Sequence, residues 1–157
     1  MAVKATVYKA TLQISDMDRH YYAEHTLTLA QHPSETDERL MVRLFAFALF
    51  AAEGLTFGRG LSSEDEPDVW RKSLTGEIEQ WIDLGQPDES RIRKACGRAR
   101  EVILVGYSGR SFDVWWDKQA AALARCKNLA VLELPIGTVT ALAGLISRNM
   151  SLQCMVQ

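Results

Sequence analysis

The chain opens with alternating apolar and polar positions. Residues 3–14 are rich in Val, Thr and Tyr, and residues 21–31 alternate in the same way after the segment 15–20. A period of two is typical of a strand with one buried face. Ser and Asp in the intervening segment favour a turn. The first thirty residues are therefore predicted to form a long β-hairpin.

The pattern becomes helical over residues 38–54, where apolar side chains cover most of a helical wheel. Such a helix is expected to be buried. Ser34, followed three residues later by Asp37, offers a cap region at its start, and Gly54 is expected to end it. Residues 55–67 are rich in Gly and acidic residues and are predicted to form a loop.

The second half begins with two short strand patterns, residues 69–74 and 77–85, around the tight turn Thr75-Gly76. A helix opened by Pro87 and Asp88 follows. The rest is predicted as strand 101–107, helix 112–127, strand 128–135, helix 138–149 and a strand over 151–157. This order predicts one α/β (α+β) domain over residues 1–157, with a mixed β-sheet flanked by helices.

Composition narrows the functional classes. The chain is 47% hydrophobic and 24% charged, which is ordinary for a globular protein, and its net charge is −2. General nucleic-acid binding usually requires a basic surplus. Contact with nucleic acid is therefore expected to be local or mediated by a metal ion.

Cysteine usage and hydropathy indicate the compartment. The three cysteines, Cys96, Cys126 and Cys154, lie far apart and form no CxxC motif. They are predicted to be reduced core thiols. No apolar run is long enough for a signal peptide or a membrane span. We expect a cytosolic protein without membrane contact.

Acidic residues recur at every second position from residue 77 onward. If this segment is a strand, Glu77, Glu79, Trp81 and Asp83 share one face, while Ile78, Ile82 and Leu84 share the other. Neighbouring carboxylates repel one another, so the acidic face requires solvent, cationic partners or a bound ion.

Asp68 begins the preceding strand. A tight turn makes the two strands antiparallel neighbours and brings Asp68 beside residues 79–83. Carboxylates that converge from adjacent strands can hold Mg²⁺. A solvated strand face is the competing interpretation, although Trp81 among the acids is less expected on a wet face.

Long segments of the chain resemble the bacterial YaeQ family. They are VKATVYKATLQISDMDRHYYAEHTLTLA, GLTFGRGLSSEDEPDVW, IEQWIDLGQPDESRIRKA and ISRNMSLQC, which together extend over nearly its whole length. Family members typically continue past the point where this chain stops, so a completing strand is expected in them. The order of hairpin, helix, Pro67-Asp68 strand, Glu79 strand and helix is also similar to the PD-(D/E)xK (restriction-endonuclease-like) nuclease core.

The resemblance implies roles for individual residues. Asp68 and Glu79 would be ligands of Mg²⁺, with Glu77 and Glu53 as auxiliary acids. In a second register Glu77 is the acid and Glu79 takes the lysine position. Trp81 stands where the motif lysine follows Glu79.

Two lysines could replace the missing one. Lys94 is the candidate for a migrated lysine, although a helical wheel points it away from the core. Lys72 shares the face of Asp68 but lies four strand residues away, about 13 Å at strand rise.

Two functions follow from these residues. One is a Mg²⁺-dependent nuclease-like phosphodiesterase with nucleic acid as its partner. The other is a catalytically inactive protein of the same fold that acts as a binding or regulatory module. The converging acids make the first the preferred prediction, whereas the absent motif lysine and the acidic composition favour the second.

Overall fold

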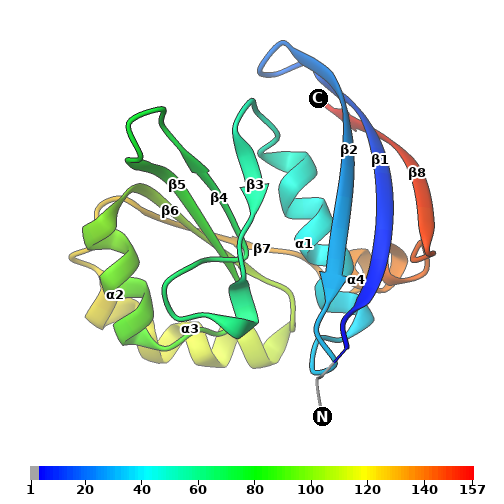
Figure 1. The fold of residues 1–157 in the computed structure, drawn as a ribbon. Coiled ribbons are helices and arrows are strands. Elements are labelled where there is room, and N and C mark those ends of the chain that lie inside the picture. The colour runs from blue at the N-terminus through cyan, green and yellow to red at the C-terminus, as the bar shows by residue number, and fades with distance from the viewer. Residues whose placement is uncertain (1–3) are drawn as a thin grey trace.

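The computed structural model describes residues 4–157, whose elements form four layers (Figure 1). A three-stranded sheet and a five-stranded sheet enclose two helices, and two further helices cover the outer face of the larger sheet. The strands are β1 (Thr6–Asp16), β2 (Tyr21–Gln31), β3 (Leu55–Phe57), β4 (Val69–Lys72), β5 (Ile78–Leu84), β6 (Ala99–Gly106), β7 (Leu129–Glu133) and β8 (Asn149–Val156). The helices are α1 (Asp37–Leu49), α2 (Glu89–Arg98), α3 (Arg110–Leu123), α4 (Ile136–Ala143) and the short 3-10 helix η1 (Gly60–Ser62).

The predicted hairpin is confirmed in the smaller sheet. β1 and β2 are antiparallel from Thr6↔Gln31 to Asp16↔Tyr21, and β8 runs parallel to β1 on its other side. Residue 3, where the predicted strand begins, lies outside the described residues. The alternating apolar residues Ala10, Leu12 and Ile14 of β1 are buried in the core shared with α1.

Helix α1 is buried as its pattern predicts, but both its ends differ from the prediction. Thr36 caps its start, because the Thr36 Oγ1 accepts a hydrogen bond from the Arg39 amide at 3.1 Å. Ser34 is not the cap. The helix ends at Leu49, and Gly54 lies in the following turn with a φ of +87°. A positive φ suits glycine because it has no Cβ to clash.

The larger sheet has the order β3-β4-β5-β6-β7 and separates two parts of the core. Ile82 and Leu84 of β5 pack on the α1 side, whereas Trp81 packs with Ala95 of α2 on the opposite side. Trp81 is 1% exposed, so the solvated strand face is wrong over this part of β5. The α+β class is confirmed, with two sheets in place of a single mixed one.

The segment predicted as loop 55–67 contains the strand β3 and the helix η1. Both are three residues long, too short for hydrophobic periodicity to reveal them. β3 pairs with β4 from Leu55↔Arg71 to Phe57↔Val69, so this segment folds back along the strand that follows Asp68.

The later helices follow the predicted strand–helix alternation with boundaries shifted by a few residues. α2 and α3 begin close to the expected starts, and the last helix both begins and ends earlier than predicted. Within residues 4–157, no helix has both the length and the apolar character needed to cross a bilayer.

Candidate functional site

Two buried carboxylates lie side by side where β4 begins and β5 ends. The ladder pairs Val69 with Ile82 and Trp70 with Trp81. Continued by one residue, this register places Asp68 opposite Asp83, and the two carboxylates interact electrostatically. Asp68 is 3% exposed and Asp83 is 4% exposed. Directly opposed residues of antiparallel strands have Cβ atoms about 5 Å apart. The hairpin thus brings two acids to one point beneath the protein surface.

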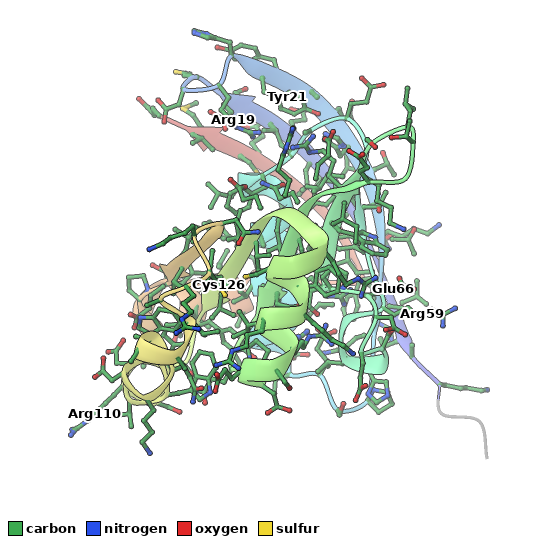
Figure 2. The ribbon with its side chains drawn as sticks, turned by 90° about the vertical axis from the view of Figure 1, so that its left-hand side faces the viewer. Arg19, Tyr21, Arg59, Glu66, Arg110 and Cys126 are labelled. Carbon is green, nitrogen blue, oxygen red and sulfur yellow. The ribbon has the colours of Figure 1, made fainter. Side chains whose placement is uncertain are left out.

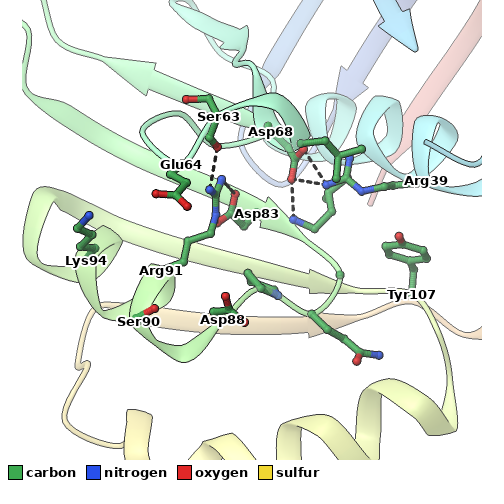
Figure 3. Close-up of a pocket in the computed structure, with 16 residues that line it drawn as sticks. Arg39, Ser63, Glu64, Asp68, Asp83, Asp88, Ser90, Arg91, Lys94 and Tyr107 are labelled. Carbon is green, nitrogen blue, oxygen red and sulfur yellow. Dashed lines mark hydrogen bonds and ion pairs between the residues drawn. The ribbon is translucent and has the colours of Figure 1, made fainter. Parts of the chain in front are cut away.

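Arginines from two helices pair with these acids (Figure 3). Arg39 of α1 donates from Nη2 to both Asp68 oxygens at 2.9 Å, and the Leu84 amide donates to Asp68 Oδ2 at 3.0 Å. Arg91 of α2 donates to Asp83 from Nε at 2.9 Å and from Nη2 at 3.2 Å. The positive charge that an acidic strand face requires is therefore present as two guanidinium groups.

Trp81 also belongs to this site. Its indole nitrogen donates to Asp83 Oδ2 at 3.0 Å, so the ring is buried while its polar atom is satisfied. The residue at the motif lysine position after Glu79 thus holds the neighbouring acid in place.

Asp68 experiences opposing electrostatic effects. Burial raises the pKa of Asp68, the charge of Arg39 acts in the opposite direction, and the nearby Asp83 adds to the rise. Burial disfavours a charged carboxylate, whereas a neighbouring cation favours it. The acid pair is therefore sensitive to any charge that enters the site.

Arg39 is held in position by a second buried acid. Glu35 accepts from Arg39 Nη1 at 2.8 Å and from Arg43 Nη2 at 2.8 Å. Glu35 and Arg43 are both 7% exposed. Buried charges are costly unless they are paired, so the Arg43–Glu35–Arg39–Asp68 chain of ion pairs ties the site to the start of α1.

A cavity of about 620 Å³ opens in front of the two acids. Ligand pockets usually measure about 300–1,000 Å³. Lys94 of α2 lies at one end of this cavity, and Tyr107, which follows β6, lies at the other (Figure 3). Burial raises the pKa of Tyr107. We call this space the acid cavity, defined by Asp68, Asp83 and Lys94.

The segment between β3 and β4 lines one side of the acid cavity through Gly60, Leu61, Ser63 and Glu64. Arg91 holds this segment, since it donates to the Ser63 carbonyl and to the Glu66 carbonyl at 2.9 Å each. Gly60 lies against Asp68, and a Cβ placed on Gly60 would be only 3.1 Å from Asp68 Cγ. Farther out on the same segment, Arg59 and Glu66 form a more exposed ion pair at 3.6 Å (Figure 2).

The structure brings two of the predicted site residues together and leaves Glu79 apart. Asp68 and Lys94 line the acid cavity, whereas Glu79 forms an ion pair with Arg71 and lines a different pocket. Glu79 is four residues from Asp83 along β5, about 13 Å at strand rise. The expected convergence of Asp68 with Glu79 is therefore wrong, and Asp83 is the acid that the register places beside Asp68.

The predicted auxiliary acids also lie away from the acid cavity. Glu77 is exposed at the β4–β5 turn, where its amide donates to Ser73 Oγ at 3.1 Å. Glu53 is exposed in the turn after α1. Arg39 marks the opposite end of that helix, so Glu53 and Asp68 lie near opposite ends of α1.

Sequence reasoning missed Glu35 and Arg39, and it placed Asp83 on the acidic face without choosing it as a ligand. Arg39 and Arg43 stand one turn apart on an otherwise apolar helix, and Glu35 precedes Arg39 by four residues. That i, i+4 spacing is a charge-pair signal. Arg91 is one of three arginines on α2, with Arg93 and Arg98, whose pattern fits phosphate contact and a solvated helix face equally well.

The acid cavity also fits the chemistry of a divalent metal. Oδ1 of Asp68 and Oδ1 of Asp83 each accept one hydrogen bond, which leaves an acceptor position on both. Within residues 4–157, no cluster of three or more His, Cys, Asp or Glu residues has metal-binding geometry. Mg²⁺ is commonly held by one or two carboxylates, with water and substrate phosphate as the other ligands. Asp68 and Asp83 would provide the two carboxylates of such a site.

A family model and individual relatives both match this chain over its whole length. The model of the YaeQ protein family matches residues 1–157. The chain is 45% identical to the uncharacterized protein YaeQ of Salmonella typhi and 43% identical to that of Escherichia coli (strain K12). Each alignment covers the whole of this chain and 87% of the relative.

Two crystal structures have the same fold. The YaeQ protein from Xanthomonas axonopodis pv. citri matches with a TM-score of 0.93 and 61% identity, over 98% of this chain and 87% of that one. The YaeQ protein from Pseudomonas syringae matches with a TM-score of 0.92 and 38% identity, over 98% of this chain and 84% of that one.

Proposed function

The chain belongs to the YaeQ family, and from the acid cavity we propose that it is a divalent-metal-dependent phosphodiesterase that acts on nucleic acid. One observation carries the proposal: Asp68 and Asp83 converge from adjacent strands in a cavity that Lys94 also lines. Two acids and a lysine are the groups that the PD-(D/E)xK motif uses. The succession of α1, antiparallel β3-β4-β5, α2 and parallel β6 supports the resemblance to that nuclease core.

Each group in the cavity has a proposed role. Asp68 and Asp83 would hold Mg²⁺, which when bound neutralises phosphate charge and makes water a better nucleophile. Lys94 would orient the phosphate or the attacking water through its ammonium group. Arg39 is a positioning residue, because its charge favours the ionised form of Asp68 despite burial.

The experiment compares two acids of the same strand. Hydrolysis of bis(p-nitrophenyl) phosphate, DNA and RNA is measured with Mg²⁺ or Mn²⁺ for the unmodified protein, Asp83→Asn and Glu79→Gln. We expect Asp83→Asn to lower the rate at least about 100-fold, the scale of losing a main electrostatic contributor. Glu79→Gln retains activity because Glu79 lies outside the cavity.

A second comparison tests the lysine. Lys94→Ala is expected to lower the rate, whereas Arg93→Gln on the exposed side of the same helix is not. Hydrolysis that needs no divalent ion, or that persists in Asp83→Asn, would contradict the proposal.

A binding or regulatory module is the second candidate, and one observation favours it. Both acids are already paired with arginine, which suits a site built for structure or for recognition of a partner. Under this function, Mn²⁺ does not bind at Asp68 and Asp83 with measurable affinity. Substitution of either acid then lowers stability, and there is no hydrolytic activity for it to change.

A further inference from the structure

Arg91 connects three parts of the site through one guanidinium group. From α2 it makes two hydrogen bonds to Asp83 on β5 and one each to the Ser63 and Glu66 carbonyls of the segment between β3 and β4. Its side chain is 21% exposed, so it reaches the edge of the cavity. A planar guanidinium with several fixed donors suits such bridging, and lysine could not replace all of these bonds.

The Arg91 contact and a divalent ion oppose each other at Asp83, even though Asp83 Oδ1 has an acceptor position left. Asp83 Oδ2 already accepts from Arg91 and from Trp81, and Oδ1 accepts a second bond from Arg91. A divalent ion at Asp83 would lie close to the guanidinium and repel it. Ion and Arg91 therefore compete for the same carboxylate.

The first turns of α2 carry groups that suit a phosphate, which would be a second partner for Arg91. Ser90 and Lys94 are four residues apart on this helix and line the same cavity as Arg91. Asp88 at the N-cap makes no side-chain hydrogen bond to the helix, which leaves the first amides without a side-chain cap. Cationic side chains, a hydroxyl and a helix N-terminus together suit a phosphate group.

We propose that Arg91 exchanges partners when the site fills: the phosphate of the substrate takes the guanidinium from Asp83, and Asp83 is released to the divalent ion. This inference rests on the proposed phosphodiesterase function. It makes phosphate and ion bind cooperatively, because each removes a competitor of the other. The coupling is reciprocal by thermodynamic linkage.

The exchange also affects the segment between β3 and β4 that lines one side of the cavity. The Ser63 and Glu66 carbonyls lose their shared donor when Arg91 turns to phosphate. The wall of the cavity that this segment forms then loses its two hydrogen bonds to α2. Arg91 thereby couples phosphate recognition to the position of this wall.

The test measures Mn²⁺ binding by electron paramagnetic resonance, with and without inorganic phosphate, and free Mn²⁺ is corrected for its association with phosphate. The proteins are the unmodified chain, Arg91→Gln and the matched control Arg93→Gln, which removes the same charge from an exposed site on α2. Arg91→Lys is included because it retains the charge but not the bridging geometry. Circular dichroism checks that each variant is folded.

We expect phosphate to tighten Mn²⁺ binding at least about tenfold in the unmodified protein and in Arg93→Gln, within the usual range of coupling between sites. In Arg91→Gln, Mn²⁺ should bind more tightly without phosphate, and phosphate should change its affinity less than about twofold. If Arg91→Gln is unfolded, Arg91→Lys must show the reduced coupling.

Two negative results have different meanings. Mn²⁺ binding that is equal with and without phosphate, and no tighter in the Arg91 variants, overturns the exchange while leaving the metal site intact. An absence of Mn²⁺ binding by every protein, with or without phosphate, overturns the proposed function and the exchange together.

Discussion

A methyl group at Gly60 should damage the acid cavity in a way that the same change elsewhere does not. Gly60 has a φ of +49°, and a Cβ placed there would overlap Asp68 Oδ1 and lie 3.1 Å from Asp68 Cγ. Gly76, at the β4–β5 turn, has a φ of +89°, and a Cβ placed there would have no atom within 4 Å. Gly76→Ala is therefore a control for the backbone cost alone.

The structure gives the size of the difference. A left-handed backbone conformation destabilises a residue with a Cβ by about 1–2 kcal/mol. Replacing glycine by alanine also reduces the conformational entropy of the unfolded chain, which stabilises the folded state by about 0.4–1 kcal/mol. Gly76→Ala should thus be destabilising by at most about 1.6 kcal/mol. In Gly60→Ala the Asp68 carboxylate must also move from Arg39 or the Leu84 amide, and a hydrogen bond to a charged group contributes about 1.5–3 kcal/mol. We expect Gly60→Ala to be less stable than Gly76→Ala by about 2 kcal/mol.

Urea unfolding followed by tryptophan fluorescence measures both variants. Equal slopes allow the midpoints to be compared directly as stabilities. A difference of less than about 0.5 kcal/mol between the stabilities of Gly60→Ala and Gly76→Ala is expected only if no key contact is lost. Such a result would refute the close packing of Gly60 on Asp68.

Three further predictions concern sites outside the acid cavity. Burial raises the pKa of Cys96 to about 12, so its alkylation by iodoacetamide should be slow at pH 8. The alkylation rate should rise about tenfold per pH unit, and a rate independent of pH would contradict the prediction. The hydrogen bonds from Arg19 lower the pKa of Asp16, so Asp16→Asn should reduce the melting temperature at pH 7. The difference in melting temperature between the two proteins should shrink as the pH falls below about 4, because Asp16 of the unmodified protein then also loses its charge. Glu79→Gln breaks the partly exposed pair with Arg71 and should cost less than about 1 kcal/mol in urea unfolding; a cost above about 2 kcal/mol would show that this pair is a core element of the fold.

The sequence predicted the fold well where periodicity is strong. The hairpin β1–β2 and the buried helix α1 follow from regular apolar spacing over eleven and thirteen residues. β3 and η1 were missed because three residues carry too little pattern. The helix cap at Thr36 in place of Ser34 shows that cap residues are interchangeable in sequence, while the local backbone selects one of them.

The candidate site was predicted in part, and its errors have two causes. Asp68 was identified, and the expected antiparallel register already placed it beside the far end of residues 79–83. The preference for Glu79 came from the family motif, whereas the ladder opposes Asp68 to Asp83. Alternation revealed the shared face of Trp81 and Asp83, but only the packing of α2 shows that this face is buried.

The arginine partners could not be derived from the sequence. Arg39 and Arg91 reach the acids from different helices, 29 and 8 residues away along the chain. No local spacing encodes contacts across elements that meet only through the tertiary fold. The helical wheel correctly turned Lys94 away from the core, yet that outward direction is where the cavity lies.

A crystal grown with Mn²⁺ and inorganic phosphate tests the central claim most directly, because anomalous scattering locates the ion. The account predicts a peak about 2.0–2.3 Å from carboxylate oxygens of both Asp68 and Asp83, with Arg91 turned to phosphate and no peak at Glu79. Saturating Mn²⁺ with no peak between Asp68 and Asp83, and with both arginine pairs intact, would contradict it.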